Sequence, residues 1–422
     1  MYGKGSYSII KIYNDNKTLI EKKFTNGLFH FTSLREIGIY KYFEYNNIDA
    51  FLKIRGINYN GIVLDRYRKT LQDLNTQHML IEDKINIIFS LIKLVKILHD
   101  NNITHRDIKP ENILWNNIND IKIIDFGISQ LGNYNKKICN ELNMNVYTKY
   151  WQPPEIYDKK IYTNKADIWA LGIVFVRILI YISDENIFNI INGFKINDKT
   201  KIFEEYKDYL IDKIKNSRPD EPDRFKDLFI NDLLLDLIMN MLLPDQELRY
   251  DINDCINHPL FNERPLAPLA QLAQPDKYKL VYIQSQERIK CLNYILTLCD
   301  EYNLSNYTLL YSYIIYDRLY SLKKGEFDME FNYIIICKSC IYIAISICDI
   351  YDISLTHFKN IDYCLTNILT ILNYNIYYYS PLDYLMEIEN KNSNIIRISS
   401  NIIQDYIDMK YDNIKDLVIN NI

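Results

Sequence analysis

A short loop with three chemically different polar residues constrains this 422-residue chain more than any other stretch. The segment THRDIKPENIL contains Asp107, Lys109 and Asn112, and the segment IIDFG that follows contains Asp125. Phosphoryl transfer requires such a set: a carboxylate accepts the proton of the attacking hydroxyl, a cation neutralises the moving group, and oxygen ligands hold Mg²⁺. We therefore predict a catalytic role for Asp107, Lys109 and Asn112. Asn112 and Asp125 are the predicted metal ligands.

These segments resemble the catalytic loop and the Asp-Phe-Gly turn of protein kinases, and the resemblance covers roughly residues 2–261. It implies a two-lobed α+β fold, ATP and Mg²⁺ as cofactors, and serine or threonine residues of proteins as acceptors. Lys109 and Thr148 match serine/threonine kinases rather than tyrosine kinases. The long span between Gly172 and Arg249 leaves room for the helical insert of the cyclin-dependent and MAP kinases.

A glycine-rich segment, YGKGSYSIIK, lies at the start of the chain. It reads as a turn between strands in which Gly3 and Gly5 let backbone N–H groups approach phosphates. Ser8 replaces the third glycine of the family pattern. Because Met1 lies almost inside this turn, we expect only a stub of the strand that leads into it. Either nucleotide binding is weakened or the start codon is misassigned.

A short β-like run, LIEKKF, carries two adjacent lysines. Alternation along a strand places Ile20 and Lys22 on one face and Lys23 on the other. The kinase resemblance implies that a lysine of this strand binds the phosphates of ATP, and we choose Lys22, with Lys23 as the fallback. A solvated, charged strand without this role is the alternative.

The segment TSLREIGIYKYF has apolar residues at helical spacing, and Thr32 or Ser33 is its expected N-cap. Its Leu-Arg-Glu resembles the end of the signature helix of cyclin-dependent kinases. The resemblance implies that Glu36 pairs with Lys22, and that Leu34 is an apolar contact for a cyclin. A surface Arg-Glu pair on a solvated helix is the alternative.

Two further segments fit the same resemblance. Residues 61–67 read as a strand that enters a linker, and residues 81–99 read as a long helix that leads into the catalytic loop. In kinases the corresponding linker is the hinge that binds adenine. The resemblance therefore implies cofactor contacts for Leu64, Asp65 and Tyr67.

The segment that follows Asp125 resembles a kinase activation segment ending in VYTKYWQPPE. The resemblance implies two supporting contacts: one joins Glu155 to Arg249, and the other joins Asp167 to the catalytic loop.

The activation segment lacks the phosphorylated threonine of the family. Kinases of this group hold that phosphate with three arginines, of which Arg35 and Arg106 are present and the third is replaced by Gln130. The phosphosite itself aligns with Asn143. We expect Glu141 to supply a permanent negative charge in its place, so that no activating kinase is needed. A solvated Glu141 without this role is the alternative.

Composition changes at residues 262–277, NERPLAPLAQLAQPDK, where Pro and Ala concentrate, which predicts a linker. Three segments with helical spacing follow at residues 286–301, 307–322 and 331–350. They resemble the first half of a cyclin box. We predict a kinase domain at 1–261, the linker at 262–277, an all-α cyclin-box-like domain at 278–390 and a helical tail at 391–422.

The cyclin resemblance implies a buried ion pair between Arg288 and Asp317. The lysine and glutamate with which cyclins contact the kinase helix are replaced by Ser346 and Leu365. Charged residues also occur in the substrate-docking patch of the family, at Lys290 for example. A generic helical bundle used for dimerisation is the alternative for this region.

The bulk composition excludes several classes of protein. A net charge of −5 and an isoelectric point near 5.8 argue against broad adhesion to nucleic acid or membranes. No apolar run is long enough to span a bilayer, and the N-terminus has no signal-like apolar core. Cys337 and Cys340 form a lone CxxC among apolar residues, which indicates a buried helix rather than a metal site. We expect a soluble intracellular protein, in cytoplasm or nucleus.

The motifs together favour a serine/threonine kinase of the cyclin-dependent type. We expect activation in cis by its own cyclin-like domain, or by a homo-oligomeric partner, because fusion raises the effective concentration to about millimolar. The alternative is a pseudokinase scaffold, in which the stub strand and Ser8 abolish the use of ATP.

Overall fold

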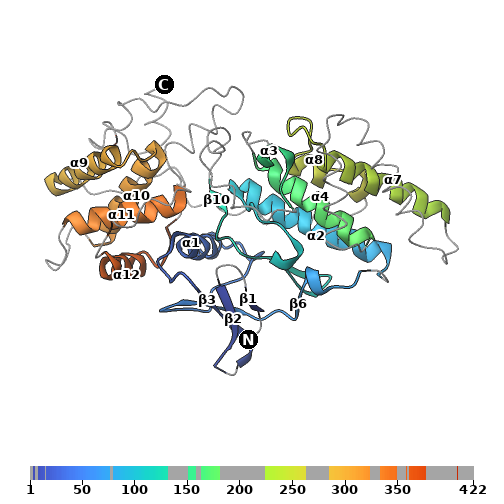
Figure 1. The fold of residues 1–422 in the computed structure, drawn as a ribbon, viewed down its shortest axis with the longest axis horizontal. Helices are drawn as coiled ribbons and strands as arrows, with labels where there is room; N and C mark the ends of the chain where they lie inside the picture. Colours follow the sequence, from blue (N-terminus) through green and yellow to red (C-terminus); the bar gives the residue numbers. More distant parts are fainter. Residues whose placement is uncertain are drawn as a thin grey trace. The chain divides into compact units, whose positions relative to one another are not determined.

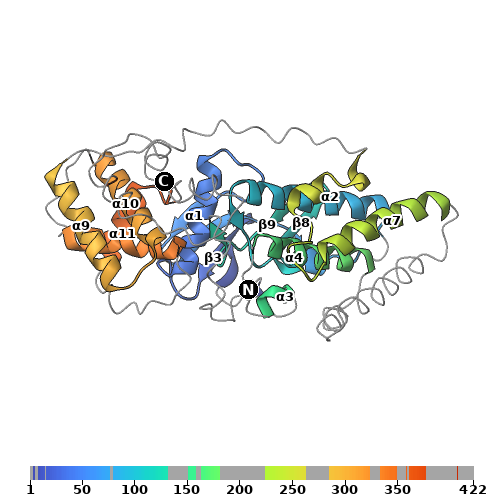
Figure 2. The same ribbon diagram turned by 90° about the horizontal axis from the view of Figure 1, so that it is seen from above.

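The computed structural model describes two compact units, shown in Figures 1 and 2. Their residues come from 1–66, 131–133 and 272–422 in the first unit, and from 67–130 and 134–271 in the second. The described residues are 3–4, 8–14, 16–76, 79–131, 151–157, 163–180, 224–262, 285–323, 333–348, 358, 361–376 and 406. The predictions made for Gly5, Glu141, Asn143, Thr148, linker residues 263–277 and nearly all of the tail lie outside the described residues.

The first unit contains an antiparallel five-stranded sheet with the order β1-β2-β3-β5-β4. Its strands are β1 (Gly3–Lys4), β2 (Ser8–Tyr13), β3 (Asn16–Phe24), β4 (Gly56–Asn58) and β5 (Gly61–Asp65). The strands predicted over LIEKKF and at residues 61–67 are present as β3 and β5. At Gly61 a β-carbon would collide with the backbone carbonyl of Lys22, so the close pairing of β5 with β3 at this point requires glycine.

Helix α1 (Phe31–Tyr45) lies between β3 and β4 in the chain and confirms the predicted helix. Its predicted N-cap was wrong, because the helix begins at Phe31 and its cap is His30, two residues before Thr32. Nδ1 of His30 accepts the backbone N–H of Thr32, and it also lies 2.8 Å from Thr32 Oγ1. The Thr32 hydroxyl is therefore engaged with the true cap. Along α1, Leu34, Arg35 and Glu36 are all buried.

The C-terminal part of the first unit is helical, as predicted. Its helices are α9 (Gln286–Glu301), α10 (Asn306–Leu322), α11 (Tyr333–Cys348) and α12 (Asp362–Ile371). Ser285 and Ser305 cap α9 and α10 with their side-chain oxygens. Helix α11 packs against α9, α10, α12 and α1, and both views show it beside α1 (Figures 1 and 2). Because neighbours surround α11, its sequence is apolar on nearly every side and residues 339–348 are all buried.

The contact of α1 with α11 explains how the units divide the chain. Residues 1–66 belong with the C-terminal helices, whereas the motif-based boundary was placed after residue 261. The predicted domain boundaries follow from sequence motifs and composition, whereas the two units are defined by which residues contact one another.

The second unit is mainly helical. Its helices are α2 (Ile81–Asp100), α3 (Pro154–Tyr157), α4 (Lys165–Ile180), α7 (Arg224–Met241) and α8 (Ile252–Ile256), with 3₁₀ turns η1 (Leu71–Asp73), η2 (Pro110–Asn112) and η5 (Pro259–Phe261). Its strands are β6 (Lys69–Thr70), β7 (Ile103–Thr104), β8 (Ile113–Asn117) and β9 (Asp120–Ile123), and β10 (Gln130–Leu131) follows. Strands β6, β8 and β9 form one sheet. Because β8 and β9 are antiparallel, the loop before β8 and the turn after β9 lie at the same end of these two strands.

None of the helices in the described ranges is long and apolar enough to cross a membrane. Cys337 and Cys340 are fully buried on α11, as the apolar surroundings predicted. Among the described residues there is no group of His, Cys, Asp and Glu that could hold a metal ion through three such ligands.

Candidate active site

The loop between β7 and β8 brings the three predicted catalytic residues together. Nδ2 of Asn112 donates to both the backbone oxygen and Oδ2 of Asp107, each at 2.9 Å. Nζ of Lys109 lies 2.7 Å from the same Oδ2. The 3₁₀ turn η2 makes this possible, because it folds Asn112 back over the loop. The result is a carboxylate held between an amide donor and a cation.

Asp167 on helix α4 supports the catalytic loop. Its carboxylate accepts the backbone N–H groups of His105 and Arg106 at 2.7 and 2.8 Å, and it lies 3.0 Å from Nε2 of His99. Arg106 has φ of 71°, which strains a residue with a side chain, and the bonds to Asp167 offset that strain. Burial alone raises the pKa of Asp167, but the hydrogen bond and charge of His99 bring that pKa below its ordinary value. The predicted support of the loop by Asp167 is present.

The turn after β9 is attached to the same loop. The backbone oxygen of Asn112 accepts the N–H of Ile124 at 2.9 Å, which places Asp125 immediately beyond the joined strands. Asp125 has φ of 71°, and the following Phe126 is fully buried with its ring 5.1 Å from that of His105. The backbone strain at Asp125 is therefore held by the Ile124 hydrogen bond on one side and by the buried Phe126 on the other.

The donor atoms at this edge fit a hard divalent cation. Because Asn112 uses its amide nitrogen on Asp107, its side-chain oxygen is left as an acceptor. Asp125 adds a carboxylate. Oxygen atoms of amides and carboxylates are the ligands that Mg²⁺ takes in proteins, and nucleotide-dependent sites supply only one or two of them from the protein.

In the first unit, the predicted lysine and glutamate form a buried ion pair. Nζ of Lys22 on β3 lies 2.7 Å from Oε1 and 2.8 Å from Oε2 of Glu36 on α1. Both side chains are less than a tenth exposed. The fallback, Lys23, is on the opposite face and pairs with Glu21 at 3.3 Å. The ion pair of Lys22 with Glu36 that the kinase resemblance implied is therefore present, and the alternation of the strand separates the two lysines as expected.

The other predicted cofactor residues have defined positions. Gly3 is in β1, and Leu64 is buried in β5. The carboxylate of Asp65 forms an exposed pair with Arg55, with Nη2 and Oδ2 at 2.8 Å. The hydroxyl of Tyr67 donates to Oδ1 of Asp120 at 2.6 Å.

A second buried ion pair anchors the segment at residues 151–157. The guanidinium of Arg249 binds both carboxylate oxygens of Glu155, at 2.7 and 2.9 Å, and it lies over the ring of Trp169. The predicted contact of Glu155 with Arg249 is present. Because both side chains are buried, the pair holds this segment in one geometry.

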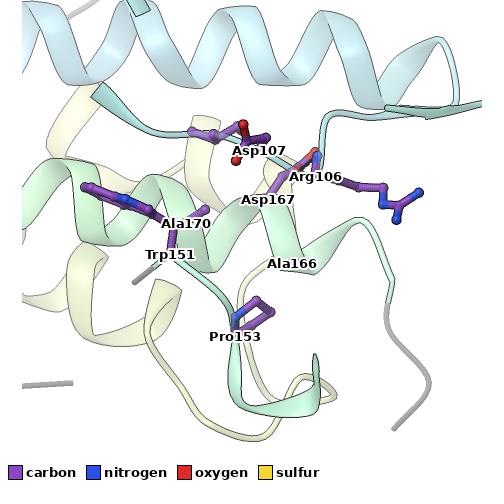
Figure 3. A pocket seen from close by; sticks show the side chains of 8 residues that line it. Arg106, Asp107, Trp151, Pro153, Ala166, Asp167 and Ala170 are labelled. Atoms are coloured by element: carbon purple, nitrogen blue, oxygen red, sulfur yellow. Dashed lines mark hydrogen bonds between the residues drawn. The ribbon is translucent and has the colours of Figure 1, made fainter. Parts of the chain in front are cut away.

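A small pocket lies where this segment meets the catalytic loop (Figure 3). Trp151 and Pro153 line it from the segment, Asp107 lines it from the loop, and Ala166 and Ala170 line it from α4. The side chain of Arg106 points away from Trp151 and Pro153 in Figure 3. The charged residues Arg106 and Asp167 line the pocket together with Asp107.

Helix α1 makes two polar contacts with α11 that the sequence did not reveal. Nε of Arg35 donates to the backbone oxygen of Ser346 at 3.0 Å, and the hydroxyl of Tyr342 donates to the backbone oxygen of Phe29 at 2.9 Å. Both acceptors are backbone atoms, which leave no trace in a sequence. Ser346 was singled out only because it replaces a charged residue, and Tyr342 carried no signal of its own.

The predicted ion pair of the C-terminal helices is also present. Nε and Nη2 of Arg288 bind the carboxylate of Asp317 at 2.7 and 2.8 Å, and both residues are buried. Burial raises the pKa of Asp317, although the bonds with Arg288 oppose that shift. Tyr406 adds a hydroxyl bond to Asp317 at 3.0 Å, so one described residue of the tail takes part in this cluster.

Comparison with known families agrees with this geometry. The family described as protein kinase domain matches residues 3–261, and the family described as cyclin, N-terminal domain, matches residues 266–377. The protein kinase match includes the ion pair of Lys22 with Glu36 and the whole catalytic loop.

Individual relatives point the same way. Cyclin-dependent kinase 11 of Dictyostelium discoideum is 28% identical over 270 residues, which cover 59% of this chain and 73% of the relative. Serine/threonine-protein kinase CST20 of Candida albicans is 35% identical over 150 residues, which are 35% of this chain and 12% of the relative. Extracellular signal-regulated kinase 1 of Candida albicans is 29% identical over 42% of this chain and 46% of the relative. The chain thus spans less than half of the last two relatives.

Proposed function

Because this chain belongs to the protein kinase family and is a serine/threonine protein kinase, we propose that its catalytic loop transfers the γ-phosphoryl group of ATP to protein serine and threonine residues. The observation that carries this proposal is the placement of Lys109 and Asn112 around the carboxylate of Asp107. The carboxylate of Asp107 accepts the proton of the substrate hydroxyl. Lys109, 2.7 Å away, offsets the negative charge of the group in transfer.

The remaining site residues have binding roles in this proposal. Glu36 orients the ammonium of Lys22, which binds the phosphates of ATP. The glycine-rich turn with Gly3 and Gly5 contacts phosphates, and the strand and linker with Leu64, Asp65 and Tyr67 contact adenine. Asn112 and Asp125 would hold Mg²⁺, which neutralises charge on the phosphates when it is bound.

The direct test is transfer itself. We expect the purified chain, supplied with labelled ATP and Mg²⁺, to label serine and threonine peptides in a peptide library and to leave tyrosine peptides unlabelled. Removal of the metal with EDTA is expected to abolish the labelling, because Asn112 and Asp125 then lack the ion that positions the phosphates.

A pseudokinase scaffold is the rival function. It predicts that the chain labels no peptide in this experiment, whether or not it binds ATP. The buried pair of Lys22 and Glu36 argues against it, because burying two charges is costly without a role that keeps them.

Regulation through the cyclin-like domain is the second part of the proposal. We propose that this domain activates the kinase in cis, because α11 packs directly on α1, the helix that carries Glu36. Leu34, the residue predicted to contact a cyclin, is buried on that helix. A partner from a second copy of the chain is the alternative source of the same contact.

We further propose that activation needs no phosphate on the activation segment. Arg35, one of the two remaining arginines of the family phosphate pocket, instead donates to the Ser346 carbonyl. Glu141 supplies the permanent negative charge that the phosphate provides in relatives.

Both parts of this regulation can be measured together. We expect the specific activity of protein made in bacteria to stay constant over a hundredfold dilution, because a domain on the same chain has an effective concentration of about millimolar. Treatment with a phosphatase is expected to leave that activity unchanged. Activation by a second copy instead predicts that specific activity falls on dilution.

The variant Glu141→Gln isolates the charge. It is expected to be less active than the wild type at every concentration, because it removes the carboxylate and keeps the size of the side chain. Unchanged activity in Glu141→Gln would show that Glu141 does not replace the phosphate.

A further inference from the structure

We infer that Tyr342, on the cyclin-like part of the chain, is a positioning residue that holds helix α1 where Glu36 meets Lys22. This inference rests on the proposed function, and it names the residue through which the helical domain acts on the kinase helix. It is carried by two hydrogen bonds that join α11 to the start of α1.

The first bond fixes the chain just before α1. The Tyr342 hydroxyl donates to the carbonyl of Phe29 at 2.9 Å, and Phe29 immediately precedes the N-cap His30. The Tyr342 ring is buried at 7% exposure and packs on Phe358, with ring centroids 5.7 Å apart. Because the ring is buried and in contact with Phe358, its hydroxyl is held within hydrogen-bond distance of the Phe29 carbonyl.

The second bond reaches the second turn of α1. Ser346 is among the last four residues of α11, whose carbonyls have no partner within the helix. Nε of Arg35 donates to the Ser346 carbonyl, and a cation at the C-terminal end of a helix also interacts favourably with its dipole. Arg35 is buried, so water competes little for this contact.

The two anchors are themselves connected on α11. The Ser346 hydroxyl donates to the carbonyl of Tyr342 at 2.9 Å, and the two residues are one helical turn, about 6 Å, apart. On the other side, Phe29 and Arg35 lie on either side of the N-cap of α1. Two attachment points of this kind set both the position of α1 along its axis and its rotation about that axis.

The position of α1 determines whether Glu36 meets Lys22. Glu36 follows Arg35 directly, so any rotation or shift of this part of α1 moves its carboxylate away from Lys22 Nζ, now 2.7 Å distant. Tyr342 touches neither ATP nor the reacting atoms, and it acts through the position of α1. A net hydrogen bond changes a local equilibrium by about 2- to 10-fold, which is the size of effect to measure.

The experiment compares two tyrosine hydroxyls in the full-length protein. Tyr342→Phe keeps the buried ring and removes the bond to Phe29. Tyr320→Phe is the matched control, because the Tyr320 hydroxyl lies 3.0 Å from Ser285 Oγ, a contact between two helical-domain residues. Backbone amide hydrogen exchange in residues 31–36 and the kcat and KM for ATP are measured for the wild type and both variants.

We expect Tyr342→Phe to accelerate exchange in residues 31–36 by about 2- to 10-fold and to lower kcat/KM for ATP by a similar factor. Tyr320→Phe is expected to leave both quantities at the wild-type value. Three results overturn the inference: unchanged exchange in Tyr342→Phe, faster exchange without loss of activity, or an equal effect of the control. If the wild type itself transfers no phosphate, the proposed function fails, while the exchange data still decide whether Tyr342 holds α1.

Discussion

Replacing Asp107 with Asn is expected to lower kcat for peptide phosphorylation by about 10²- to 10⁴-fold, the usual contribution of a positioned general base. The amide cannot accept the proton of the substrate hydroxyl. It also removes the negative partner of Lys109, whose Nζ lies 2.7 Å from Oδ2. Because Asn112 donates to both Oδ2 and the backbone oxygen, one of its two bonds survives and the loop keeps its shape. The KM for ATP is therefore expected to change little.

Steady-state kinetics of Asp107→Asn and Glu111→Gln provide the comparison. Glu111 is an exposed acid in the same loop, and its replacement is the same change from carboxylate to amide. Glu111→Gln should retain wild-type kcat. Comparable activity of the two variants would remove Asp107 from the mechanism.

Replacing Arg249 with Met is expected to lower the free energy of unfolding of the second unit by about 3–5 kcal/mol, because it leaves the buried carboxylate of Glu155 without a cation. Arg249 is 1% exposed, and its guanidinium also donates to the carbonyls of Leu243 and Lys165. Tryptophan fluorescence during denaturation with urea reports on this unit, because all three tryptophans of the chain lie within residues 67–271.

The double variant Arg249→Met with Glu155→Met tests the cause. It is expected to be more stable than Arg249→Met alone, because it leaves no unpaired charge in the interior. Lys96→Met is the partly exposed control, since Lys96 pairs at 2.8 Å with the half-exposed Asp100, and surface pairs of this kind contribute about 0–1 kcal/mol. A loss in Arg249→Met no greater than in Lys96→Met would show that the pair does not anchor the segment.

Local pattern was sufficient for much of the site. The alternation of β3 placed Lys22 and Lys23 on opposite faces, because successive side chains of a strand point to opposite faces, and the kinase resemblance implied the pairing of Lys22 with Glu36. The helical spacing around Glu36 gave the helix, but its N-cap was wrong. The observed cap is His30, two residues before Thr32, whereas N-cap propensity favours threonine.

The sequence could not predict the hydrogen bonds that these side chains make with backbone atoms. The bonds of Tyr342 to the Phe29 carbonyl and of Arg35 to the Ser346 carbonyl depend on how α11 and α1 approach each other. Every residue has such a carbonyl, so no residue type marks the one that is used. The same reason hid the bond from the tail residue Tyr406 to Asp317, because no spacing rule links residues so distant in the chain.

The sequence by itself determined the chemistry of this protein. Asp107, Lys109, Asn112 and Asp125 are close in the chain, so a short loop and a turn, supported by Asp167 of α4, bring them together. Only the tertiary structure decided which surface supports the kinase helix. That surface is created by packing α11 against α1, and packing between segments some 300 residues apart depends on side-chain shape and on backbone groups that the order of residues does not display.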